Sequence, residues 1–84
     1  MPPTTYTNLY EITELQQKIM RYIDYWAHVE KTPISQQEVI KQMEDRNQNF
    51  KSVKYALGGL LKLGYLRQAN IISNKTYYVM LRRL

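Results

Sequence analysis

The sequence predicts a small α+β domain in which three helices precede a β-hairpin. Apolar residues recur at three- and four-residue steps in three segments up to Gly64, whereas short runs of aromatic and branched residues follow it. The chain has 84 residues with 44% hydrophobic content, which suits one domain with one core. Cysteine is absent, so packing rather than disulfides or thiolate metal sites must stabilise this domain.

Residues 1–12 are expected to form a flexible arm before a domain at 13–84, because Met1–Thr7 contains two adjacent prolines and three threonines. This start also lacks the positive residues and the apolar run of a signal peptide. No stretch of about 18 apolar residues follows. We therefore expect a soluble, cytoplasmic protein without a membrane segment.

The first helix has two candidate starts, the capping boxes Asn8 with Glu11 and Thr13 with Gln16, of which we favour Thr13. It should fray near residues 30–31. Its apolar stripe and the flanking residues should be buried in the core rather than form a ligand site: Leu15, Ile19, Ile23 and Trp26, with Ile12, Met20 and Ala27.

The second helix has three start signals: Ser35 as N-cap, Glu38 as its reciprocal partner, and Ile34 placed to pack on Val39 as a hydrophobic staple. A proline just before them ends the first helix. Ile34 is expected to form a very short strand. The helix should end near residues 43–44, with an inner face made of Val39, Ile40 and Met43.

The third helix lies within residues 47–64, where asparagines before Phe50 offer N-caps and Gly64 offers a left-handed stop. One face should be buried: Phe50, Val53, Leu57, Leu60 and Leu61. The opposite face has no acid: Lys51, Ser52, Lys54, Tyr55, Gly58 and Lys62. Glycines 58 and 59 inside this helical pattern indicate close packing against another element or close approach to a backbone.

The hairpin is predicted from two runs, Tyr65–Ala69 and Thr76–Leu81, with turn residues Ser73–Lys75 between them. Residues 70–72 either extend the first strand or belong to a wider loop. The polar connector at 44–49 joins the second and third helices, and these form a helix-turn-helix candidate even though the connector lacks the glycine often found in such turns.

Charge is distributed unevenly along the chain. Up to Arg46 there are seven acidic and five basic residues, whereas from Asn47 onward there are seven basic residues and no acid, so the two parts carry −2 and +7. This polarity is typical of a protein that presents one end to a polyanion. Nucleic acid is preferred over an acidic membrane surface, because the second half contains no long amphipathic helix able to lie in lipid.

Catalysis is not expected, because the chain has one histidine, no cysteine, and acids dispersed over its first half. His28 is interpreted as a surface or packing residue, and Glu44–Asp45 as a solvated turn rather than a cation site. We expect no metal, no cofactor and no small-molecule ligand.

The order of elements and several local motifs resemble the winged helix-turn-helix superfamily, and within it the amino-terminal DNA-binding domain of the bacterial SOS repressor, with looser similarity to MarR-like regulators. The similarity spans Thr13–Leu81. The matching residues are Thr13-Glu14-Leu15-Gln16-Gln17, Pro33-Ile34-Ser35 with Glu38-Val39, and Leu57 and Leu60 with Leu63-Gly64-Tyr65-Leu66.

The resemblance implies a winged helix, a three-helix helix-turn-helix core followed by a β-hairpin wing, whose third helix enters the DNA major groove. The implied groove-facing residues are Asn49, Lys51, Ser52, Lys54 and Tyr55, with Lys75 at the tip of the wing. Lys62 on the same helix face and Arg67 on the hairpin complete the DNA-binding set. These residues do not reproduce the readers of the SOS repressor, and the chain leaves no room for its protease-like domain, so neither its operator nor self-cleavage is implied.

The expected function is sequence-specific binding of double-stranded DNA, as a small transcriptional regulator that is nucleoid-associated when bound. Two alternatives remain open: a winged-helix protein-interaction module, and a DNA-binding accessory protein of replication or recombination. An isolated module of this size makes an interface on the order of 600 to 1,000 Å², which favours a homodimer. The sequence does not identify the dimer surface, the operator or the direction of regulation.

Overall fold

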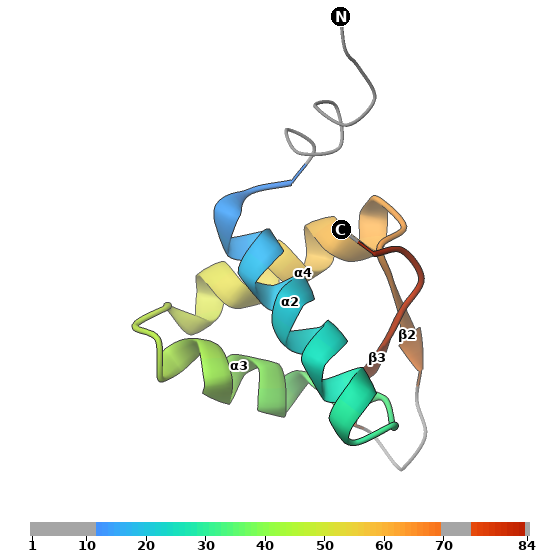
Figure 1. Ribbon diagram of the computed structural model, residues 1–84. Helices are drawn as coiled ribbons and strands as arrows, with labels where there is room; N and C mark the ends of the chain where they lie inside the picture. The colour runs from blue at the N-terminus through green and yellow to red at the C-terminus, as the bar shows by residue number, and fades with distance from the viewer. Residues whose placement is uncertain (1–11, 70–74, 84) are drawn as a thin grey trace, which may run out of the picture.

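The computed structural model describes residues 12–69 and 75–83. These residues form an α+β arrangement of three helices and a three-stranded antiparallel sheet (Figure 1). The elements in chain order are α2 (Glu14–Val29), β1 (Ile34–Ser35), α3 (Gln36–Glu44), α4 (Phe50–Lys62), β2 (Leu66–Ala69) and β3 (Tyr77–Met80). None of the helices in these ranges is long and apolar enough to cross a membrane.

The sheet has the order β1-β3-β2, so the short strand before α3 joins the hairpin. Residues Ile34 and Tyr78 are partners between β1 and β3, and Leu66 and Met80 are partners between β2 and β3. The predicted short strand and hairpin are thus confirmed, although each hairpin strand is shorter than expected. The question left open at 70–72, and the turn residues 73–74, lie outside the described residues.

The start of α2 is the capping box predicted at Thr13. The Gln16 backbone N–H donates to the Thr13 hydroxyl at 3.1 Å, and the Thr13 N–H donates to the Gln16 side-chain oxygen at 2.8 Å. The alternative box at residues 8 and 11 lies outside the described residues. Ile12 is buried in the core, as expected from its place beside the apolar stripe of the first helix.

The start of α3 confirms only half of its predicted capping box. The Ser35 hydroxyl accepts from the Glu38 N–H at 3.1 Å, as expected. The Glu38 carboxylate does not accept a hydrogen bond from the Ser35 N–H, as the reciprocal half of the box would require. It accepts instead from the Tyr22 hydroxyl at 3.3 Å and from the Gln42 amide at 3.5 Å. A partner on α2 therefore replaces the reciprocal cap.

The core lies between α2, α3, the inner face of α4 and one face of the sheet. Two expectations about burial are wrong: Phe50 is 45% exposed, and Ala27 is also exposed. Phe50 is the first residue of α4, beyond the part of the helix that packs, and the Lys54 ammonium lies 5.8 Å from its ring centre. The buried apolar residues are Ile12, Ile19, Met20, Ile23, Ile34, Val39, Met43, Val53, Ala56, Leu57, Leu60, Tyr65, Leu66 and Tyr78.

Candidate nucleic-acid interface

The turn between α3 and α4 sets where α4 begins. Asn47 has φ +65°, a left-handed conformation that asparagine tolerates, and so it replaces the glycine that the connector lacks. Asn49 is the N-cap of α4, and its side-chain oxygen accepts from the Lys51 N–H at 2.7 Å. Predicted as a groove-facing residue, Asn49 thus has its oxygen engaged, and its exposed NH₂ group remains free to donate.

The outer face of α4 brings together five of the predicted site residues. Val53, Ala56, Leu57 and Leu60 are buried, so the opposite side of the helix faces solvent. Tyr55 is 87% exposed. From residue 51 to residue 62 the stripe extends about 16 Å along the helix. Its exposed members are Lys51, Ser52, Lys54, Tyr55, Gly58 and Lys62.

The lysines of this outer face carry unneutralised charge. Across residues 12–69 and 75–83, none of these lysines lies in a salt bridge. The His28 imidazole Nδ1 on α2 lies 3.4 Å from an Asp24 carboxylate oxygen, a contact that is an ion pair only when the imidazole is protonated. His28 is exposed, which confirms its interpretation as a surface residue. No cluster of three or more potential metal ligands occurs in those ranges. The chemistry available on the outer face of α4 is therefore that of exposed cations and neutral polar groups.

Gln16 connects α2 to α4, a role that its place in the sequence does not indicate. Its side chain is 8% exposed, and its Nε2 donates to the Ala56 carbonyl at 3.1 Å while its oxygen accepts from the Thr13 N–H. A Cβ added at Gly59 would lie 2.5 Å from that Nε2, whereas nothing lies within 4 Å of one added at Gly58. The close packing predicted for the glycine pair is therefore confirmed at Gly59 alone.

The hairpin residues of the predicted set lie apart from the α4 stripe. Arg67 is exposed on β2, and Lys75 is exposed two residues before β3. Lys75 borders a small hollow with the residues at the start of α3, Ser35, Gln36 and Gln37. Figure 1 places the two hairpin strands on the side of the helices away from the α3–α4 turn. Residues 70–74, between Ala69 and Lys75, lie outside the described residues.

Arg82 holds the junction between α4 and β2. Its guanidinium carbon lies 4.1 Å from the centre of the Tyr65 ring, and its Nη1 lies 3.5 Å from the Leu63 carbonyl oxygen at the end of α4. Gly64 follows with φ +84°, the left-handed stop that was predicted. The sequence does not indicate this role of Arg82, because a side chain 19 residues from its partner gives no local signal.

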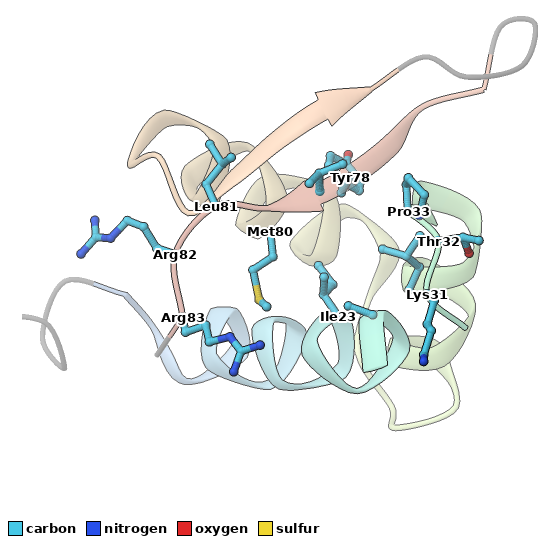
Figure 2. A pocket seen from close by; sticks show the side chains of 12 residues that line it. Ile23, Lys31, Thr32, Pro33, Tyr78, Met80, Leu81, Arg82 and Arg83 are labelled. Atoms are coloured by element: carbon cyan, nitrogen blue, oxygen red, sulfur yellow. The ribbon is translucent and has the colours of Figure 1, made fainter. Parts of the chain in front are cut away.

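A second hollow, here called the β3 groove, lies between α2 and the end of β3 and has a volume of about 560 Å³. Figure 2 shows Ile23 and Met80 pointing into it and Arg82 pointing away. No acidic residue lines the groove, and three cations do. Its lining is Ile23, Ala27, Lys31, Thr32, Pro33, Ile34, Tyr78, Val79, Met80, Leu81, Arg82 and Arg83.

Comparisons with protein-family models, with curated proteins and with solved structures found no match to this chain. The assignment of its function therefore depends on the geometry and charge of its own surfaces.

Proposed function

We propose that this chain is a winged-helix protein that binds double-stranded DNA sequence-specifically and acts as a small transcriptional regulator. The observation that carries the proposal is the outer face of α4, where exposed lysines and Tyr55 form one acid-free stripe on a helix whose other face is buried. The proposed activity is binding alone, without catalysis, cofactor or small-molecule ligand. We place it in the cytoplasm, associated with the nucleoid.

The order of elements supports the winged-helix part of the proposal. Helices α3 and α4 are joined by a five-residue turn, and a hairpin follows α4 and pairs with the short strand before α3. In a winged helix this arrangement presents the second helix of the pair to the major groove and the hairpin to the backbone or minor groove. In this chain those two elements are α4 and the β2–β3 hairpin.

The dimensions of α4 suit the major groove. The 13 residues of α4 extend about 20 Å, and the major groove, about 12 Å wide, admits an α-helix. Residues near the start of a recognition helix usually reach deepest, so Lys51 and Tyr55 are assigned to base edges. Lys54 and Lys62 lie on the same face and are assigned to phosphates, each releasing counterions when it binds.

Selection of bound sequences from a random duplex pool tests the proposal, followed by affinity measurements on the selected site. The variant Lys51→Ala/Lys54→Ala/Tyr55→Ala should bind that site at least about 100-fold more weakly, because base-reading contacts contribute about 1 to 3 kcal/mol each. The control Lys18→Ala/Lys41→Ala removes the same charge from α2 and α3 and should lose less than about tenfold at equal salt. Unchanged duplex affinity in the triple variant would contradict the proposal.

The second candidate function, a protein-interaction module, is favoured by the β3 groove. Strand β1 pairs only with residues 77 and 78 of β3, whereas β2 pairs with residues 77–80. The β3 edge at Val79–Met80 is therefore open on the β1 side among the described strands, beside an apolar floor and the cations Lys31 and Arg83. An extended acidic segment of another protein fits this chemistry. If the duplex pool yields no bound sequence, this candidate replaces the first.

A role as an accessory protein of replication or recombination would use the same α4 contact with DNA. The location of the selected sequence in the genome separates the two DNA-binding roles. A site within promoters supports regulation of transcription, and a site at a replication origin or recombination site supports the accessory role.

A further inference from the structure

The centre of the outer face of α4 is a line of four exposed residues. They follow one another at steps of four, three and four positions, which places them opposite the buried side of the helix. The third of them is a glycine, so the side chains of this line that can reach a base lie near the start of the helix or in its last turn. The four residues are Lys51, Tyr55, Gly58 and Lys62.

Lys54 lies at the edge of this face rather than on its central line. It precedes Tyr55 by one position, about 100° around the helix, and its ammonium lies 5.8 Å from the centre of the Phe50 ring. When a helix lies in the major groove, its edges face the phosphate backbones and its centre faces the bases. This geometry agrees with a phosphate contact for Lys54, and Lys51 is then the cation that faces the bases at the start of α4.

Asn49, just before the helix, can donate to a base, but its oxygen is already used. That oxygen accepts from the Lys51 backbone N–H at 2.7 Å and so caps α4. The paired contact between asparagine and adenine needs both ends of the amide, because the oxygen accepts from the adenine N6 amino group while the NH₂ group donates to N7. With its oxygen turned to the backbone of α4, Asn49 offers a base only its NH₂ group.

The polar groups at the start of α4 therefore donate hydrogen bonds far better than they accept them. The Lys51 ammonium has donors and no acceptor, the Asn49 NH₂ group donates, and the Tyr55 hydroxyl can do either. No carboxylate lies on the outer face. In the major groove, guanine alone presents two adjacent acceptors, N7 and O6, whereas adenine and thymine present one each and cytosine presents none. A side chain that only donates therefore fits guanine best.

We propose that α4 recognises a guanine through Lys51, whose ammonium donates to N7 and O6 in the major groove. Asn49 donates to an acceptor of the adjacent base. This recognition rests on the proposed binding of double-stranded DNA, and it specifies the base and the atoms that are read. The site therefore contains a required guanine, at a position where adenine is rejected because its N6 amino group would face the ammonium.

Single-atom changes in the selected duplex test the contact. Each guanine is replaced in turn by 7-deazaguanine, which lacks the N7 acceptor, and by inosine, which keeps N7 and O6 and lacks only the minor-groove amino group. At the guanine that Lys51 contacts, 7-deazaguanine should weaken binding of the wild-type chain at least about fivefold, and inosine less than about twofold. Lys51→Ala should be insensitive to 7-deazaguanine at that position, because the group that contacts N7 is gone.

An altered-specificity variant tests which residue reads the guanine. Lys51→Gln supplies the amide oxygen that the start of α4 lacks, and glutamine pairs with N6 and N7 of adenine. Selection with this variant should return adenine instead of guanine at that base pair, preferred at least about fivefold. The matched control Lys41→Gln removes the same charge from an exposed position of α3 and should still return guanine. Guanine at that base pair in the Lys51→Gln selection would overturn the assignment, whereas loss of preference at that pair alone would support it.

Failure of this recognition is distinguishable from failure of DNA binding itself. A wild-type chain that selects a specific duplex but tolerates 7-deazaguanine at every position would overturn the reading of guanine and leave DNA binding in place. A pool that yields no bound duplex would overturn both. Lys51 is exposed, so its variants should keep the thermal unfolding of the wild type, and a change in binding then reports on the contact with DNA.

Discussion

The inner and outer faces of α4 belong to the same 13 residues but obey different constraints. On the inner face, Val53, Leu57 and Leu60 are buried, and their three- and four-residue spacing is required by the core. On the outer face, Lys51 and Lys54 are exposed and lie in no salt bridge among the described residues, so the core does not require a lysine at either position. The residues of the inner face are therefore determined by the fold, and those of the outer face by the proposed partner. Substitutions on the inner face should change stability, and substitutions on the outer face should change binding.

The largest expected effect is on the inner face. Leu60→Ala should lower the free energy of unfolding by about 2 to 5 kcal/mol, because Leu60 is fully buried and alanine leaves a cavity among well-packed neighbours. Lys54→Ala on the outer face should change stability by no more than about 0.5 kcal/mol. Urea denaturation of both variants measures the difference. A loss below about 1 kcal/mol for Leu60→Ala would show that the inner face is not constrained as described.

Most of the fold could be predicted from the sequence because its signals are local. A few neighbouring residues are enough to predict each of three features: the Thr13 capping box, the short strand at Ile34 and the left-handed Gly64. The errors have tertiary causes. Phe50 has the right spacing for the inner face but lies at the helix end, where no described element covers it. The Glu38 carboxylate accepts from Tyr22, 16 residues earlier, instead of completing the capping box.

The candidate site likewise has a part that the sequence predicts and a part that it does not. The outer face of α4 could be predicted, because the periodicity that buries one side of a helix also says which residues face solvent. The contacts that hold α4 in place could not. Gln16 reaches Ala56 across 40 residues, and Arg82 reaches Leu63 across 19.

Two lysine substitutions, one on the outer face of α4 and one on the hairpin, separate base reading from the effect of charge. Lys51→Ala should weaken binding to the selected duplex by about 1 to 3 kcal/mol and relax its preference at one base pair. Lys75→Ala, on the hairpin, should weaken all duplexes alike and reduce the salt slope by about one unit. Titrations of cognate and scrambled duplexes at several salt concentrations measure both. Equal losses on the two duplexes for Lys51→Ala would assign that residue to phosphate contact alone.

The smallest expected effect concerns the boundary between the two faces, at glycines 58 and 59. Alanine is favoured over glycine within a helix by about 1 kcal/mol, and a Cβ at Gly58 meets nothing within 4 Å, so Gly58→Ala should stabilise the protein by about 0.5 to 1 kcal/mol. At Gly59 the same Cβ would meet the Gln16 amide. Gly59→Ala should therefore destabilise it by about 1 kcal/mol net, since displacing that amide weakens two hydrogen bonds, each contributing about 1 kcal/mol.

Alanine at Gly58 and alanine at Gly59 are expected to change stability in opposite directions because of one side chain, that of Gln16, which can be removed. In a Gln16→Ala background the amide is absent, so Gly59→Ala should become stabilising by up to about 1 kcal/mol, while the effect of Gly58→Ala should stay as it was. Thermal and urea unfolding of the wild type, of Gln16→Ala, of Gly59→Ala and of their double variant gives the coupling between positions 16 and 59. If Gly59→Ala destabilises equally with and without Gln16, then the backbone of α2, rather than the Gln16 amide, limits how closely α4 approaches.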